Sequence, residues 1–452
     1  MEENPQTAHG LRTFFTIWSG QLVSLVGSQL TGFAMGVWIY SQTRSVMMLA
    51  ITQVAAQAPY VLLSPLAGVL ADRWNRRTAM IVSDFGAGLA VLAAGTLYIT
   101  NHLQFWMVVL INLWIAAFNT LMWPSLSAAV TLLVPKKQYG RANGILQLGE
   151  AIPQVAGPAL AGVLYVAIHL GNMALIDFST YLFSVMLMLF FVRIPNPPRS
   201  TPEGQAKGSL WQEMGFGWTY IRARPGLLGL LLFFMMTNFF GGVINPLLTP
   251  LILDNWNAST LGFIGTLMGV GMLAGTLVMS AWGGGKRKVI PLLGGGMLSG
   301  LFLAAAGVRV SLPLLSVCGF CFIFFMPIMN ACSQAIWQAK VAPDVQGRVF
   351  AVRRTIAAGA TIVSPLLAAP LADYVFKPAM APGGALAGLL GPLFGVGAAR
   401  GIGVLISLVG LLLALVAATA LLVPLVRQVE LDIPDHAAAE PAAVSPDPAP
   451  VP

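Results

Sequence analysis

The chain has 452 residues, of which 57% are hydrophobic and only 9% are charged. Soluble domains carry about 25% charged residues, so these proportions exclude a water-soluble protein and predict an integral membrane protein. The net charge of +8 does not indicate a nucleic-acid partner, because the basic residues fall in short segments between apolar runs. The sequence has no P-loop, H-E-x-x-H or G-x-S-x-G motif, which argues against an enzyme and against ATP as the energy source. We expect neither a cofactor nor a bound metal.

Twelve apolar runs are long enough to cross the hydrocarbon core of a bilayer, which needs about 20 residues per helix. A chain inside lipid has to satisfy its own backbone hydrogen bonds, so all twelve are predicted to be α-helices and the fold class is all-α. The expected spans are 14–39, 46–70, 78–99, 104–130, 142–168, 172–193, 227–252, 259–281, 289–308, 313–338, 355–376 and 402–425. Residues 378–400 are also apolar, but they are rich in Gly and Pro and are predicted to form an external loop.

The distribution of Lys and Arg predicts the orientation of the chain. Cytoplasmic loops of membrane proteins carry an excess of basic residues. With both termini in the cytoplasm, only four of the 24 basic residues fall outside, namely Arg44, Arg309, Lys377 and Arg400. We therefore expect a multi-pass protein of the cytoplasmic (inner) membrane with both termini on the cytoplasmic side.

An internal repeat divides the chain into two pseudo-symmetric six-helix halves. Residues 134–144 align without gaps with residues 341–351, an offset of 207 residues that places Gly140-Arg141 over Gly347-Arg348. Such duplication is typical of transporters built from two similar halves. The predicted parts are an N-terminal half, a cytoplasmic linker with a short interfacial helix, a C-terminal half and a disordered acidic Ala/Pro-rich tail, at residues 1–194, 195–226, 227–427 and 428–452.

The turn between the second and third spans reads G-V-L-A-D-R-W-N-R-R over residues 68–77. It resembles the loop between helices 2 and 3 of the major facilitator superfamily, in which the Asp and Arg contact the ends of neighbouring helices and help to hold one of two alternating states. The resemblance implies a gating role for Gly68, Asp72, Arg73, Arg76 and Arg77. Asn75 stands where the family usually has Gly, and because Asn tolerates a left-handed backbone we expect the turn to be preserved. The alternative for such a motif is a solvated basic cluster at the membrane surface.

The fifth span carries a second resemblance. Small residues and a proline reproduce the spacing of the antiporter motif of major facilitator exporters, at Gly144, Gly157, Pro158 and Gly162. Pro153 and Ala161 depart from that motif, which has Gly at both positions. Small residues let helices approach closely, and a proline bends its helix. Together with the loop, R-A-N-G at 141–144 and R-G-I-G at 400–403, this span resembles the drug, macrolide and siderophore exporters, which implies proton antiport.

Four helices are expected to line a transport cavity. In this family the first helix of each three-helix unit tends to do so, and here each such helix has a polar face at helical spacing. The cavity candidates are Gln21, Ser28, Asn112, Asn119, Trp123, Asn238, Asn245, Asn330 and Gln334. The alternative is that these side chains tie helices to one another. No basic residue is expected at the middle of these helices, so neutral or cationic amphiphiles are favoured over anions.

Glu150 and Asp84 are the candidates for proton coupling. Glu150 stands nine residues past Arg141, about 13 Å along the helix at 1.5 Å per residue. A carboxylate at that depth is costly and usually faces a cavity or a partner, and desolvation favours its neutral form. Asp84 is expected nearer the inner surface, paired with Arg77 or Arg141. The alternative for Glu150 is a structural link to a neighbouring helix.

These features predict a secondary active transporter that exports small amphipathic organic compounds, of the drug, macrolide or siderophore type, by proton antiport with alternating access. The expected partners are the substrate, protons and the lipid bilayer, and we expect a monomer. Two alternatives stay open, a lysophospholipid flippase of the same fold and a membrane scaffold or sensor that does not transport. The flippase would translocate labelled lipid without a proton gradient, whereas the scaffold would tolerate neutralisation of its buried polar residues.

Overall fold

The computed structural model describes residues 5–135, 138–192, 194, 210–342 and 345–435, and in these residues every regular element is a helix. Eleven of the described helices are long and apolar enough to cross a membrane. One of them, Gly144–Phe191, has 48 residues, which is about twice the length needed for one crossing. His169 inside it has a non-helical backbone, with φ 54° and ψ 179°. This helix therefore crosses twice, and the predicted fold of twelve spans is confirmed.

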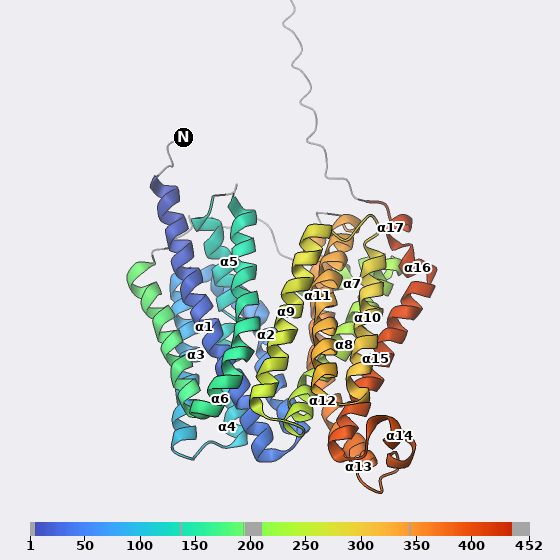
Figure 1. Ribbon diagram of the computed structural model, residues 1–452. Helices are drawn as coiled ribbons and strands as arrows, with labels where there is room; N and C mark the ends of the chain where they lie inside the picture. Colours follow the sequence, from blue (N-terminus) through green and yellow to red (C-terminus); the bar gives the residue numbers. More distant parts are fainter. Residues whose placement is uncertain (1–4, 136–137, 193, 195–209, 343–344, 436–452) are drawn as a thin grey trace, which may run out of the picture.

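The elements follow the chain in two groups (Figure 1). The N-terminal half contains α1 (Pro5–Thr43), α2 (Val46–Arg73), α3 (Arg76–Ile99), α4 (Phe105–Asn119), α5 (Met122–Leu133) and α6 (Tyr139–Phe191). The amphipathic helix α7 (Leu210–Arg222) precedes the C-terminal half, which contains α8 (Pro225–Leu253), α9 (Ala258–Trp282), α10 (Val289–Val308), α11 (Leu312–Lys340), α12 (Gln346–Pro370) and α15 (Ala398–Leu422). Helices α6 and α12 begin 207 residues apart, which is the offset of the repeated motifs.

The turn between α2 and α3 uses extended rather than left-handed backbone. Asn75 has φ −61° and ψ 124° and is the N-cap of α3, where its side chain accepts a hydrogen bond from the backbone N of Arg77 at 2.9 Å. The expectation of a left-handed Asn75 is therefore wrong. Asn suits this position because its side-chain oxygen satisfies one of the free N–H groups at the start of a helix.

The eleventh span is longer than predicted. Helix α12 continues through a π-helix, η2 (Leu371–Phe376), into α13 (Lys377–Met380). The chain then turns back through α14 (Ala387–Phe394), whose eight residues are too few to cross a bilayer. Met380 and Phe394 are buried together with Val404 of α15, so the predicted loop at 378–400 is a partly buried hairpin of short helices.

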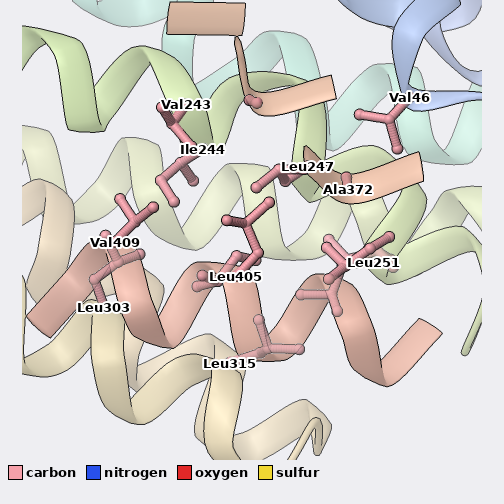
Figure 2. Packing of buried hydrophobic residues seen from close by; sticks show 14 of the residues in the cluster. Val46, Val243, Ile244, Leu247, Leu251, Leu303, Leu315, Ala372, Leu405 and Val409 are labelled. Atoms are coloured by element: carbon pink, nitrogen blue, oxygen red, sulfur yellow. The ribbon is translucent and has the colours of Figure 1, made fainter. Parts of the chain in front are cut away.

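The two halves meet at one end of the molecule. The largest apolar cluster joins them there, because Val46 and Ala50 of α2 are buried together with Ala368 of α12 and Ala372 of η2. Figure 2 shows Val46 in this cluster with Ala372 and Leu251. The end at which the halves meet also contains Arg44 and Lys377, two of the basic residues predicted to lie outside.

After the last span, α16 (Pro424–Arg427) and α17 (Val429–Asp432) fold back against the C-terminal half. The carboxylate of Glu430 accepts hydrogen bonds from the backbone N of Lys288 at 3.0 Å and of Val289 at 2.9 Å, which caps the start of α10. Lys340, at the end of α11, is 4% exposed. Its Nζ donates to the Glu430 carbonyl at 2.6 Å and forms an ion pair with Asp435 at 2.8 Å. The prediction that disorder begins at residue 428 is therefore wrong for residues 428–435, and residues 436–452 lie outside the described part.

We expect Lys340→Met to destabilise the protein, because the carbonyl groups of Glu430 and Ile433 lose their charged donor. A hydrogen bond to a charged group contributes about 1.5–3 kcal/mol, so the midpoint of thermal unfolding in detergent should fall by a few degrees. Lys286→Met, at an exposed lysine in the turn before α10, is the control and should leave the midpoint unchanged. Equal midpoints for all three proteins would show that the C-terminal segment is not anchored through Lys340.

Candidate functional site

A cavity of about 280 Å³ lies between α8, α9, α11 and α12 of the C-terminal half. Three of the candidate cavity residues line it, Asn238 and Asn245 of α8 and Asn330 of α11. The two asparagines of α8 are seven residues apart and so share one helix face. Apolar residues such as Phe322 and Met326 form most of the remaining wall. The wall is therefore mostly apolar with a few amide groups, which is the usual composition of a small-molecule site.

A second cavity, of about 190 Å³, adjoins the first and shares Phe234, Asn238 and Asn330 with it. Gln334 of α11, another of the candidates, lines this second cavity. No arginine is among the described residues that line the larger cavity. The smaller cavity is lined by two basic residues that were assigned to the cytoplasmic side, Arg353 and Arg354 of α12.

Arg353 is seven residues into α12, which begins at Gln346, or about 10 Å along the helix axis. Its guanidinium lies on the cavity wall, where Nη1 donates to Gln334 Oε1 at 3.0 Å and Nη2 donates to Ser333 Oγ at 3.2 Å. Arg353 belongs to the eleventh span, which was not one of the four helices expected to line the cavity, so the sequence analysis did not place a cation here. The signal was present in the sequence, because the repeat offset of 207 predicts where α12 starts and hence the depth of Arg353.

The polar residues predicted on α1 build a buried network rather than a cavity wall. Gln21 is 8% exposed, and its Nε2 donates to Asp84 Oδ2 at 2.7 Å and to Ser184 Oγ at 3.0 Å. Ser184 Oγ donates to the same Asp84 oxygen at 2.7 Å. Asp84 is 2% exposed and is thus held by neutral groups from α1 and α6.

The expectation that Asp84 pairs with Arg77 or Arg141 is wrong. The Arg77 guanidinium instead donates to the carbonyl groups of Met188 at 2.9 Å and Leu189 at 2.6 Å, near the end of α6, and Arg141 is exposed. Among the described residues, Asp84 forms no ion pair. A carboxylate in this position is costly when ionised.

A second buried carboxylate, Asp177 of α6, was missed by the sequence analysis. Its side chain is fully buried, and Ser28 Oγ donates to its Oδ1 at 3.4 Å. Its Oδ2 is buried without a hydrogen-bond partner among the described residues. Ser28, a predicted cavity residue, also lies 2.9 Å from the hydroxyl of Tyr181. An acid in the middle of an apolar run was the available signal, and it is the same signal that singled out Glu150.

The remaining candidates on α4 and α5 have different surroundings. Asn112 donates to the carbonyl of Val108 in its own helix at 2.9 Å. Asn119 lies beside Tyr60 of α2 and Tyr181 of α6, at the edge of the carboxylate network. Trp123 is 47% exposed. None of these three side chains lines either of the two cavities of the C-terminal half.

The antiporter-motif helix forms the seam between the halves. A Cβ on Gly162 of α6 would lie 2.9 Å from the Cα of Gly262 of α9, and Ser259 Oγ donates to the Gly162 carbonyl at 3.1 Å. Pro158 lies against Gly265 one turn further along the seam. Two motif positions are not used in this way, because Gly157 faces α1 of its own half and a Cβ on Gly144 would meet nothing within 4 Å.

Glu150 precedes Gln154 of α6 by one helical turn. A Cβ on Gly269 of α9 would lie 2.7 Å from the Gln154 carbonyl oxygen, so Glu150 lies one turn from a contact between the halves. The Glu150 side chain is exposed, and it forms no ion pair with any described residue. In this conformation Glu150 is therefore not tied to a neighbouring helix.

Polar contacts join the halves at the end of the seam that is predicted to lie outside. The hydroxyl of Tyr40 in α1 lies 2.8 Å from both carboxylate oxygens of Asp254, and Arg44 Nη1 lies 3.3 Å from Asp254 Oδ1. Ser45 Oγ donates to Asp373 Oδ2 at 2.8 Å. Each of these contacts joins a residue of the N-terminal half to a carboxylate of the C-terminal half.

The predicted gating loop is described only in part. Gly68, Asp72 and Arg73 belong to α2, and their side-chain surroundings lie outside the described part of the structure. Arg76 has its Nε and Nη1 buried without a hydrogen-bond partner among the described residues. Arg77 joins the start of α3 to the end of α6.

The arrangement of two six-helix groups around a seam agrees with comparisons to known proteins. The sequence profile described as Major Facilitator Superfamily matches residues 17–244, half of the chain. The chain belongs to this family. It is accordingly a multi-pass membrane transporter.

Two relatives of this major facilitator transporter are named macrolide efflux protein A. The one from Streptococcus pyogenes is 28% identical over 375 residues, which cover 80% of this chain and 90% of the relative. The one from Enterococcus faecalis is 28% identical over 310 residues, which cover 66% of this chain and 93% of the relative. The fold is similar to the crystal structure of a bacterial homologue of the human lysosomal transporter Spinster in an inward-facing and unoccupied conformation. The TM-score is 0.68 at 14% identity, with 95% of this chain and 98% of that chain covered.

Proposed function

We propose that this transporter exports small amphipathic organic compounds across the cytoplasmic membrane by proton antiport with alternating access, with both termini in the cytoplasm. The observation that carries the proposal is the different chemistry of the two halves. The C-terminal half has a mostly apolar cavity with amide groups, and the N-terminal half holds two buried carboxylates among neutral partners. The names of the two macrolide efflux relatives support export as the direction.

The cavity supports an amphipathic substrate. Amides at Asn238, Asn245 and Asn330 offer both donors and acceptors, while Phe322 and Met326 offer an apolar surface that adapts to irregular shapes. A site of this composition selects for compounds with a large apolar part and a few polar groups. It lies beside the seam, where transporters with repeated halves bind their substrates.

The carboxylates support coupling to protons. Asp84 and Asp177 lie in a region without water-exposed surface, where the neutral form of a carboxyl group is favoured over the charged form. Glu150 lies one helical turn from the contact of Gln154 with Gly269, and it would be covered when the halves close at that end. A carboxyl group whose hydration differs between two states binds its proton with different affinity in each, which is the requirement for coupling.

The seam supports alternating access. The contacts between halves gather where Tyr40 meets Asp254 and Ser45 meets Asp373, so the described conformation is closed at the predicted outer end. The small residues along α6 and α9 allow close helix packing that is lost when the halves tilt the other way.

The decisive experiment uses purified protein in liposomes with an imposed proton gradient and a panel of radiolabelled amphiphiles, including a macrolide. We expect wild-type protein to accumulate at least one compound against its gradient. Glu150→Gln is expected to reduce this proton-driven transport while retaining downhill substrate exchange, and Glu203→Gln in the linker is the matched control. Equal loss of both activities would assign Glu150 to folding or substrate binding.

The alternative functions predict different results in the same liposomes. If the proton gradient changed the transport rate of none of the compounds, proton antiport would be overturned. Translocation of labelled lysophospholipid without a gradient would favour a flippase. Absence of any transport by folded protein, together with tolerance of Asp84→Asn in the cell, would favour a scaffold.

A further inference from the structure

Arg353 has the features of a ligand-binding residue rather than of a surface charge. Its two hydrogen-bond acceptors, Gln334 Oε1 and Ser333 Oγ, are neutral. Its guanidinium carbon also lies 5.3 Å from the centre of the Trp337 ring and 5.7 Å from that of Phe234. Trp337 is fully buried, so these neighbours hold the guanidinium in one position on the cavity wall.

The guanidinium keeps unused donors. An arginine side chain has five N–H groups, and the hydrogen bonds of Arg353 to Gln334 and Ser333 each use one of them. The planar fork of such a group matches the two oxygens of a carboxylate or phosphate. Arg353 can therefore hold its two neutral partners and still donate to a ligand.

The charge of the smaller cavity is unbalanced. Arg354 lines it beside Arg353, and none of the residues described as lining either cavity is acidic. Two other arginines near the same end contact aromatic rings outside the cavity. The guanidinium carbon of Arg348 lies 4.5 Å from the ring centre of Phe216 in α7, and that of Arg224 lies 3.6 Å from the ring centre of Tyr220. Two adjacent cations in a cavity without a lining carboxylate attract an anion.

We propose that Arg353 and Arg354 form a subsite for the anionic group of an amphipathic ligand, whose apolar part occupies the adjoining larger cavity. The two cavities share Phe234, Asn238 and Asn330, so one molecule can reach both. The anionic group is a carboxylate or phosphate, carried by a free amphiphile or by a lipid headgroup. The inference extends the proposed export function by naming a substrate class, but it is tested by binding at equilibrium, without transport.

The test uses the full chain in phosphatidylcholine nanodiscs and two fluorescent probes, 1-pyrenebutyrate and its neutral amide. Fluorescence anisotropy gives the affinity for each probe. Wild-type protein is expected to bind the acid about 10-fold more tightly than the amide, because a charge-assisted bidentate pair is stronger than a neutral one. Arg353→Gln should abolish this preference with little change for the amide, and Arg353→Lys should restore part of it.

Arg309→Gln is the matched control, because Arg309 is exposed at the opposite end of the C-terminal half, and it should keep the wild-type preference. Equal affinity of wild-type protein for acid and amide would overturn the proposal. An equal loss of affinity for the acid and for the amide in Arg353→Gln would also overturn the proposal, because Arg353 would then only shape the cavity.

A second arm identifies the source of the anion. Nanodiscs that contain phosphatidylglycerol should compete with 1-pyrenebutyrate in wild-type protein, but not in Arg353→Gln, if a lipid headgroup occupies the subsite. Unchanged acid binding in these nanodiscs assigns the subsite to free amphiphiles. Intact acid preference together with a failed export assay would overturn the export function and leave the subsite standing.

Discussion

Asp84→Asn is expected to lower proton-driven export by about 5- to 150-fold while downhill substrate exchange continues. This range corresponds to coupling free energies of about 1–3 kcal/mol. The asparagine oxygen can accept the hydrogen bonds of Gln21 and Ser184, which both reach the same carboxylate oxygen of Asp84. The variant therefore keeps the contacts among α1, α3 and α6 and resembles a permanently neutral carboxyl group.

The measurement compares accumulation driven by an imposed proton gradient with exchange of labelled for unlabelled substrate in the same liposomes. Asp432→Asn, at an exposed carboxylate after the last span, is the control and should behave as wild type. Asp177→Asn tests the second buried carboxylate in the same way. If Asp84→Asn pumped at the wild-type rate, the buried network would have a structural role and coupling would have to be assigned elsewhere.

Gly262→Leu is expected to shift the protein toward a conformation that is open at the outer end. A Cβ on Gly262 would lie 2.5 Å from the Pro158 carbonyl oxygen and 2.6 Å from the Cα of Gly162, and both of these are backbone atoms that cannot rotate away. Overpacking of this kind costs about 1–3 kcal/mol. Because the clash exists only while the seam is closed, the cost acts on one conformation and changes the ratio of conformations by about 5- to 150-fold.

Spin labels at Gln42 and Ser311, in a chain whose three cysteines are replaced by alanine, report the separation of the halves at the outer end. We expect Gly262→Leu to lengthen this distance and to reduce transport. Gly294→Leu is the matched control, because a Cβ on Gly294 would meet nothing within 4 Å. A distance distribution of Gly262→Leu that matched the wild type would show that α6 and α9 separate little during the cycle.

The sequence predicted the fold well because bilayer physics imposes long apolar helices. The repeat offset also held in detail, since α6 and α12 begin 207 residues apart. The sequence-based predictions failed where one residue or segment was compatible with two local structures. Asn75 was expected to supply a left-handed turn, but it supplies a side-chain cap instead. The segment at 428–435 has the composition of a tail, but Val429 and Glu430 find partners on α8 and α10.

The candidate site was predicted unevenly for a physical reason. Helical spacing shows which residues share a face, so Asn238 and Asn245 were correctly grouped. Spacing does not show whether that face meets a cavity or another helix, and Gln21 and Ser28 meet buried carboxylates. Arg353 was assigned to a loop because arginine was treated as a sign of topology, although its neighbours on α11 hold it inside the helix bundle.

The separation of chemistry between the halves affects how such a protein can adapt. Asp84 and Asp177 are held by α1, α3 and α6, whereas the cavity walls belong to α8, α9, α11 and α12. Substitutions that reshape the cavity therefore leave the buried acids and their partners untouched. We expect that a lineage of this transporter can change the compounds it recognises through substitutions in the C-terminal half, while the buried carboxylates of the N-terminal half stay unaltered.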